Sequence, residues 1–295
     1  MTAIAARAAA MPALARGAVC VLIADLAFAS MDALAKGLMT RHDPLQVVWA
    51  RYAMQALLVT LLFAPRLRTV LRTQKLGMQV LRSAFMFGAT VSGFFAFSLL
   101  PLAEATAIFQ VAPLMITALA ALLLAEPVGP RRWAGVAAGF VGAMIIVRPG
   151  AAAFQPAALL PLLCALCFAG YSVSTRFLGR TEDWRTTFLY TAGLGAVLAT
   201  LWLPLVWTTP TPSDAALMVL LGLLGAAGQL MFIFAYTLAP ASAVAPLTYV
   251  GLVFAGLFGW TFFDDIPDGF TLAGAAVIVG SGLYVWRRER LGSAP

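Results

Sequence analysis

The sequence predicts an all-α integral membrane protein of ten transmembrane helices, arranged as two inverted five-helix repeats with both termini in the cytoplasm. Three observations lead to this fold class: the composition, the number of long apolar segments, and a motif that recurs at a fixed offset. Of 295 residues, 62% are hydrophobic and 11% are charged, and the mean hydropathy is +0.93. Soluble domains of this length do not have such a composition, so the expected solvent is the bilayer.

The apolar segments have the length of membrane spans. A helix needs about 20 apolar residues to cross a bilayer. The first segment carries Asp25 and Asp32 and no convincing cleavage site follows it, so it is predicted as a helix rather than a signal peptide. The ten predicted helices are roughly 17–37, 46–64, 79–100, 103–125, 131–148, 157–178, 184–205, 213–238, 241–263 and 268–286.

A repeated motif divides the chain into two similar units. Residues 93–101, GFFAFSLLP, recur as residues 232–240, FIFAYTLAP, at an offset of 139. Five spans in each unit would turn the second unit upside down in the bilayer, and inverted repeats with a site between them are typical of secondary transporters. The expected domains are an N-terminal repeat, 1–150, and an inverted C-terminal repeat, 151–295.

The fourth helix of each unit contains a proline in its interior. Pro113 and Pro246 each lack a backbone donor and are expected to kink their helices. Such breaks persist in a bilayer where protein or water satisfies the exposed backbone. Either a cavity lining or a simple packing kink accounts for them.

Basic residues gather at alternate loops. This positive-inside pattern places both termini in the cytoplasm, and it assigns the net charge of +7 to orientation rather than to nucleic-acid binding. Contact with anionic membrane lipid is a secondary expectation. The residues are Arg7, Arg16, Arg66, Arg68, Arg72, Lys75, Arg82, Arg131, Arg132, Arg176, Arg180, Arg185, Arg287, Arg288 and Arg290.

Four charged residues lie within or beside predicted spans, where a charge costs about 2.5–3.5 kcal/mol at mid-bilayer. Asp32 and Arg51 are expected at a similar depth, with Lys36 one turn from Asp32. They form either a structural ion pair or a site for a zwitterion, in which the cations meet a carboxylate and Asp32 an amine. Asp25 is deeper and has no obvious partner. It is either a proton carrier or a neutral packing acid.

Uncharged polar residues follow the two-fold relation and predict a central, water-accessible pocket. Thr90 corresponds to Gln229 and Gln110 to Tyr249 at the offset of 139. An offset of 140 relates Asp32 to Ser172, beside Tyr171. Among the nearby aromatic residues, Phe94 is a candidate for an apolar wall of the pocket, although helix packing is the commoner role.

The sequence gives no support for catalysis. It contains no phosphate-binding loop of the Walker type, and Cys164 and Cys167 lie in an apolar segment, where packing explains them better than redox chemistry. The acidic run Asp264-Asp265-x-x-Asp268 has no second acidic cluster and is expected to be a solvated outer loop. We expect no catalytic residues, no metal and no cofactor.

Several short motifs carry a resemblance over nearly the whole chain. They are Ala27-Phe28-Ala29-Ser30 with Lys36, Arg51-Tyr52, Leu100-Pro101, Glu126-Pro127 and Ala239-Pro240. The sequence resembles the drug/metabolite transporter superfamily, in its ten-helix type with two EamA-like halves. Within it, the sequence is most similar to bacterial aromatic amino acid exporters. Ala29-Ser30 stands where the family often has Trp-Gly, which points to a subgroup.

The resemblance implies efflux of a small metabolite by alternating access, around a cavity lined by helices 1, 3, 4, 6, 8 and 9. The expected function is therefore secondary export of amino acids, aromatic or large and apolar, across the bacterial inner membrane. The alternatives are a broad-specificity drug or metabolite exporter, and a membrane enzyme or scaffold that uses the outer acidic loop. Gly135-x-x-x-Gly139 favours helix packing within the chain, with a homodimer as the alternative.

Overall fold

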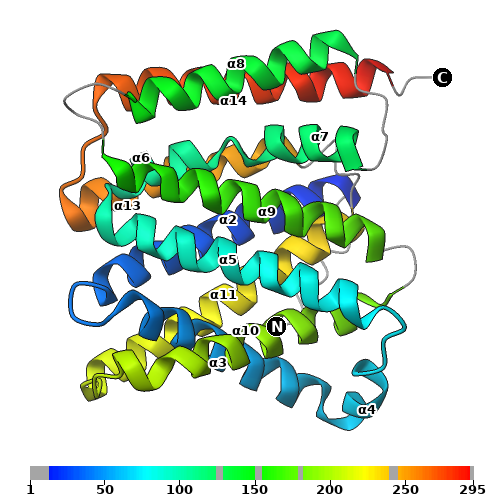
Figure 1. Cartoon of the computed structure of the whole chain (residues 1–295), viewed down its shortest axis with the longest axis vertical. Coiled ribbons are helices and arrows are strands. Elements are labelled where there is room, and N and C mark those ends of the chain that lie inside the picture. The colour runs from blue at the N-terminus through cyan, green and yellow to red at the C-terminus, as the bar shows by residue number, and fades with distance from the viewer. Residues whose placement is uncertain (1–12, 124–128, 150–154, 179–181, 239–244, 293–295) are drawn as a thin grey trace.

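The computed structural model describes residues 13–123, 129–149, 155–178, 182–238 and 245–292, and the regular structure within these ranges is helical. The long helices lie side by side in one bundle (Figure 1). They are α2 (Ala13–Leu38), α3 (Pro44–Phe63), α5 (Leu76–Leu99), α6 (Leu102–Phe109), α7 (Ala112–Leu123), α8 (Pro130–Val147), α9 (Leu159–Leu178), α10 (Trp184–Val206), α11 (Pro212–Leu238), α13 (Val250–Phe263) and α14 (Gly269–Gly292). Short connecting turns are η1 (Ala64–Arg66), α4 (Leu67–Val70), η2 (Pro156–Ala158) and η3 (Ala245–Tyr249).

The helices coincide with the predicted apolar segments to within a few residues. In the described residues, 8 helical stretches are long and apolar enough to cross a membrane, and Trp133–Val147 and Leu247–Phe263 are shorter apolar helices. Within the described residues, each predicted segment is therefore confirmed as helical, and residues 124–125 and 241–244 of the fourth and ninth segments lie outside them. That all ten cross the bilayer, and that both termini lie in the cytoplasm, stay predictions.

The fourth and ninth segments are broken helices. The fourth divides into α6 and α7 at Gln110 and Val111, because Pro113 cannot donate to the carbonyl of Phe109. The ninth begins as the 3₁₀ turn η3, which contains Pro246, and continues as α13. Helices α6 and α13, which adjoin the two interruptions, pack against each other.

The main helix pairs join the first half of the chain to the second. Helix α2 packs against α11, α5 against α9, α3 against α10, α8 against α14, and α6 against α13 (Figure 1). This pattern is unchanged when each helix is exchanged for its counterpart in the other half, as expected for two repeats related by a two-fold axis. Because the main helix contacts run between the two halves, packing does not separate the chain into two domains. The division at residue 150 therefore stays a prediction from the sequence repeat.

Glycines allow α8 and α14 to approach closely. A Cβ atom on Gly142 would lie 2.9 Å from the carbonyl oxygen of Gly274, and one on Gly135 would lie 2.5 Å from Cγ2 of Val285. Neither position has room for a larger side chain. The Gly135-x-x-x-Gly139 motif therefore packs within the chain.

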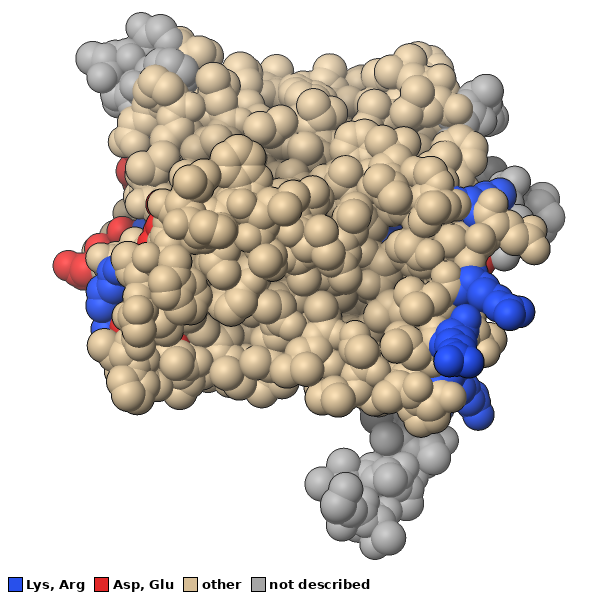
Figure 2. All heavy atoms as spheres, turned by 60° about the horizontal axis from the view of Figure 1, so that its bottom comes forward, with Lys and Arg blue, Asp and Glu red and all other residues tan. Residues whose placement is uncertain are grey.

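Figure 2 shows a broad belt without charged side chains between two charged ends. The belt exposes large apolar residues such as Leu61, Leu205 and Phe262, as a lipid-facing surface does. One end carries exposed basic residues of the connection between α3 and α5, and we call it the basic end. The opposite end holds the loop between α13 and α14, with Asp264 and Asp268.

Candidate substrate site

Arg51 brings a positive charge into the interior of the bundle. Its side chain, on α3, is buried, and its Nη1 donates a hydrogen bond to Oγ1 of Thr90 on α5 at 2.6 Å. The hydroxyl of Tyr52 lies 2.8 Å from the same Thr90 oxygen. Thr90 in turn donates to the backbone carbonyl of Met86 at 3.0 Å, which fixes the direction of its lone pairs. The Thr90 hydroxyl is thus held by its own helix and accepts the hydrogen bond that orients the Arg51 guanidinium.

Two aromatic rings flank the Arg51 guanidinium. Its central carbon lies 5.3 Å from the ring centre of Tyr52 and 5.8 Å from that of Phe94, within the range of cation–π attraction. Nε of Arg51 is buried and has no hydrogen-bond partner in the described residues. The structure therefore brings together three predicted site residues, Arg51, Thr90 and Phe94, and leaves the Nε donor of Arg51 without a partner among the described residues.

Asp32 is close to Arg51 without forming an ion pair. The two side chains interact electrostatically, and Cys164 of α9 lies in the same neighbourhood. Among the described residues, the ion pairs within 4.0 Å involve neither Asp32 nor Arg51. Asp32 is half-buried on α2. A carboxyl group and a guanidinium thus lie near each other without a direct ion pair.

Lys36 has other partners. Its Nζ lies 3.1 Å from Oδ2 of Asp265 and donates to the carbonyl of Leu100 at 2.6 Å. Asp265 also accepts from the backbone N–H of Leu102 at 3.3 Å, in the first turn of α6. The structure therefore places Lys36 apart from the Arg51 group, and Asp265 is a bonded residue rather than the solvated loop residue that the sequence predicted.

Gln229 joins the region from α11. Its Oε1 accepts a hydrogen bond from Nε2 of Gln55 at 2.8 Å, and both side chains are buried. Gln55 lies one turn after Arg51 on α3, so the two face the same way. Its own Oε1 has no partner in the described residues. Gln55 was not among the residues predicted from the sequence, although its spacing of four from Arg51 was a usable signal.

Gln110 and Tyr249 are near each other but point differently. The amide nitrogen of Gln110 donates to the carbonyl of Thr248 at 3.3 Å, which satisfies backbone freed at the break in the ninth segment. The ring of Tyr249 instead lies against Gly282 of α14, where a Cβ atom would come within 2.7 Å of Cζ. Contact of both residues with one central pocket stays a prediction.

Tyr171 and Ser172, neighbours on α9, have different surroundings. Ser172 donates to the carbonyl of Phe168 at 2.8 Å within its own helix. The Tyr171 hydroxyl accepts from Nη2 of Arg82 at 2.7 Å. Arg82 was counted with the basic loops, but it lies inside α5 with a buried side chain. This corrects the prediction: α5 begins at Leu76, so Arg82 is more than one helical turn inside the helix.

Asp25 is buried on α2. Its Oδ2 has no hydrogen-bond partner in the described residues, and the carboxyl group lies against the backbone of Gly251, where a Cβ atom would be 3.7 Å from Cγ. A carboxyl group in this position is either neutral or partnered by something that enters from outside. Both of the roles considered for Asp25, proton carrier and packing acid, fit this setting.

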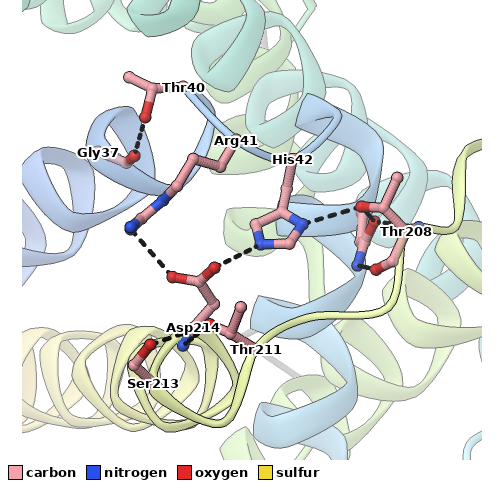
Figure 3. A network of polar contacts seen from close by, with 9 residues as sticks. Gly37, Thr40, Arg41, His42, Thr208, Thr211, Ser213 and Asp214 are labelled. Carbon is pink, nitrogen blue, oxygen red and sulfur yellow. Dashed lines mark hydrogen bonds and ion pairs between the residues drawn. The ribbon is translucent and has the colours of Figure 1, made fainter.

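A polar network closes the end of the bundle opposite the basic end (Figure 3). Nε2 of His42 lies 3.1 Å from Asp214, Nδ1 lies 2.9 Å from Oγ1 of Thr208, and Arg41 pairs with Asp214 at 3.0 Å. Gln46 donates to the carbonyl of Thr208 at 2.7 Å. The network joins the loop between α2 and α3 to the start of α11, and the His42 side chain is buried in it.

The comparison with known families follows the repeat. The family model described as "EamA-like transporter family" matches residues 15–148 and again residues 155–287. The chain belongs to the EamA-like transporter family. A solved structure with a TM-score of 0.63 and 23% identity covers 94% of this chain and 99% of its own, and it supports the fold alone.

Curated relatives of this EamA-like protein are transporters of different small molecules. It is 36% identical to a riboflavin transporter of Rhizobium johnstonii over 72% of this chain and 69% of that protein. It is 27% identical to an S-adenosylmethionine uptake transporter of Rickettsia bellii, over 91% and 92% of the two chains. It is also 27% identical to a pseudopaline exporter of Pseudomonas aeruginosa, over 93% and 97%.

The family establishes the general activity. This EamA-like chain is a multi-pass membrane transporter of a small molecule, and its relatives are transporters rather than enzymes. The predicted similarity to aromatic amino acid exporters is not reflected in these three relatives, whose names give other substrates. They also include both uptake and export.

Proposed function

We propose that the protein is a secondary transporter that exports an amino acid with an aromatic or large apolar side chain across the inner membrane. The observation that carries this proposal is the buried Arg51, which has an unused donor and lies between the rings of Tyr52 and Phe94. A carboxylate is the group that a guanidinium binds best. Asp32, which lies near Arg51, is suited to an ammonium group.

The proposed mechanism is alternating access by ten spans in two inverted repeats, 1–150 and 151–295, with both termini in the cytoplasm. Two features support it. Exposed basic residues gather at one end of the bundle, as the positive-inside rule requires of the cytoplasmic end. The main helix pairs each join the two halves, so a rotation of one half against the other would change access to the region between them.

A second candidate is transport of riboflavin or of a related ring compound. The relative with 36% identity supports it, and the rings around Arg51 suit a flat substrate. A broad-specificity exporter of drugs or metabolites remains the wider alternative. The candidates differ in one requirement: an amino acid needs the charge of Arg51, whereas a neutral ring compound needs mainly the aromatic rings and hydrogen-bond donors.

Transport into proteoliposomes distinguishes these candidates. Vesicles are loaded with unlabelled L-tryptophan or with riboflavin, and counterflow of the same labelled compound is measured. We expect tryptophan counterflow that L-phenylalanine inhibits and tryptophanamide does not, and that falls at least tenfold in Arg51→Gln. The exposed Arg68→Gln is the matched control and should keep wild-type rates. Counterflow of riboflavin alone would favour the second candidate, and absence of tryptophan counterflow would contradict amino acid export.

A further inference from the structure

A second buried arginine has no acidic partner. Arg82 on α5 is 4% exposed, and the ion pairs of the described residues do not include it. Its guanidinium is held by neutral oxygens from α9 and α10. Nε donates to Thr175 at 2.7 Å and Nη1 to Thr191 at 2.6 Å, and the ring of Tyr171 lies 4.3 Å from the central carbon. The positive charge is therefore positioned but not neutralised.

The hydroxyl groups around Arg82 are already oriented. Thr175 donates to the carbonyl of Tyr171 at 2.7 Å, and Thr191 donates to the carbonyl of Thr187 at 2.8 Å, so both present lone pairs to Arg82. Nη1 also donates to the carbonyl of Thr187 at 3.0 Å, and Nη2 donates to the Tyr171 hydroxyl. Two donors remain after these bonds: one N–H of Nη2 and the hydroxyl proton of Tyr171.

Two more polar side chains of α5 lie beside Arg82 without partners. Gln79 is 0% exposed and Ser83 is 1% exposed, and neither side chain has a hydrogen-bond partner in the described residues. Positions 79, 82 and 83 share one side of a helix. Leaving such groups unsatisfied is costly, so a buried set of this kind indicates a polar ligand that enters in part of the working cycle.

The position of this set fits a transport path. On α5, Arg82 lies about two helical turns before Thr90, the partner of Arg51, so the Arg82 group and the Arg51 group lie at different depths along one helix. Towards the basic end, a cleft of about 520 Å³ is lined by residues that include Arg66, Arg72 and Thr186, the last of which precedes the Thr187 bound by Arg82. Arg82 thus lies between the outside of the basic end and the Arg51 region.

We propose that Arg82, Tyr171, Gln79 and Ser83 form a second anion-binding subsite, which receives the carboxylate of the substrate between the basic end and Arg51. The proposal rests on the transport function proposed above. Two guanidinium groups at different depths give an anionic substrate two successive positions along α5. A purely structural clamp explains the bonds from Arg82 to the threonines, but it does not explain the unsatisfied Gln79 and Ser83.

Ligand binding by the purified full-length protein tests the subsite without transport. The background is Arg51→Gln, so that Arg82 is the remaining candidate guanidinium, and the probe is benzoate, compared with the uncharged benzamide at equal ionic strength. We expect benzoate, and not benzamide, to raise the thermal unfolding midpoint. Adding Arg82→Gln should raise the half-saturating benzoate concentration at least tenfold. Adding Arg72→Gln, an exposed arginine of the same cleft, should leave it unchanged.

A second, more conservative variant tests the subsite in case Arg82→Gln does not fold. Tyr171→Phe keeps the ring under Arg82 and removes the hydroxyl donor, and it should weaken benzoate binding several-fold. Absence of benzoate-specific stabilisation in the Arg51→Gln protein overturns the subsite, as does equal binding with and without Arg82. Stabilisation by short-chain phosphatidylglycerol but not by benzoate would assign the charge to a lipid headgroup and also overturn it. Failure of tryptophan counterflow with benzoate binding intact would contradict only the amino acid proposal.

Discussion

The ammonium group of Lys36 lies 3.1 Å from Oδ2 of Asp265, and this ion pair ties α2 to the loop between α13 and α14. Both side chains are largely buried, and each has a further bond, from Lys36 to the carbonyl of Leu100 and to Asp265 from the N–H of Leu102. The pair therefore joins the first and last thirds of the chain at the end opposite the basic end. The Lys36–Asp265 ion pair would have to break for a substrate to pass between α2 and α13 at that end.

Loss of one partner should weaken the fold measurably. Lys36→Met leaves Asp265 without its cation, and we expect a loss of about 1.5–3 kcal/mol, the range for hydrogen bonds to charged groups. The matched control is the more exposed pair Arg148 and Asp268, at 2.8 Å, where Arg148→Gln should cost about 0–1 kcal/mol. Unfolding in detergent micelles measures both. Equal losses at the two sites would show that Lys36 is not held as the structure indicates.

Labelling of single cysteines tests the predicted orientation. Gln74 lies at the basic end and Ser213 lies beside the network of Figure 3, and both are exposed. In a background without Cys20, Cys164 and Cys167, Gln74→Cys should react with a membrane-impermeant reagent only from the cytoplasmic side. Ser213→Cys should react only from outside. Reaction of both from the same side would contradict the inverted repeat.

Thr90 should matter for substrate affinity more than for folding. Thr90→Val keeps the side-chain shape but removes the oxygen that receives Nη1 of Arg51 and contacts Tyr52. We expect KM for the transported substrate to rise roughly tenfold, which corresponds to about 1.4 kcal/mol. Ser98→Ala on the same helix is the control, because the Ser98 hydroxyl is exposed and, among the described residues, bonds only to the carbonyl of Phe95. Equal KM values for the two variants would separate Thr90 from the site.

Asp25 offers a test of proton coupling. Asp25→Asn preserves the shape of a buried side chain whose Oδ2 lacks a partner. If Asp25 carries the proton, the variant should lose transport driven by a pH gradient and keep exchange of labelled for unlabelled substrate, since exchange needs no net proton movement. Loss of neither activity would assign Asp25 to helix packing. Loss of both together with a lower unfolding temperature would do the same.

The carboxylate of Asp268 should make the stability of the start of α14 depend on pH. The backbone N–H of Thr271 donates to its carboxylate at 2.8 Å, and this bond, followed by the Thr271 side chain and by Arg148, lowers the pKa of Asp268. A carboxyl group with a lowered folded pKa stabilises the fold above its unfolded pKa of about 3.9, and the stabilisation disappears as pH falls through the folded value. The unfolding temperature should therefore fall less steeply below pH 4 in Asp268→Asn. Arg148→Gln should keep most of the wild-type dependence, because the Thr271 bond remains.

The helices could be predicted from the sequence, and their side-chain partners could not. Apolar length and the offset of 139 are properties of the chain itself, so the ten segments and the repeat were accessible. Arg82 was counted with the basic loop although it fell inside the predicted helix 79–100, and its burial depends on its neighbours in α9 and α10, which the sequence does not give. The partner of Lys36 is more than 200 residues away, and no pattern of spacing connects it to Asp265.

The candidate site shows the same limit. Arg51 was predicted in a charge cluster and Thr90 and Phe94 in a central pocket, and the three meet because α3 and α5 are neighbours in sequence and in space. Tyr249 was matched to Gln110 by the repeat, but its ring fills the space above Gly282, which only the packing of α14 creates. A two-fold relation between positions therefore predicts similar depth without predicting the direction of each side chain.

The pairing of helices across the two halves has a consequence for synthesis. Helices α2, α3, α5 and α8 all have their main neighbours in residues 159–292, which the ribosome makes later. Helices inserted first must therefore stay in the bilayer without these neighbours, and their polar groups, Arg51 and Arg82 among them, must be satisfied temporarily by water or lipid headgroups. The finished bundle can close only after α14 is inserted, so a chain truncated before α14 would present unassembled helices to the membrane proteases.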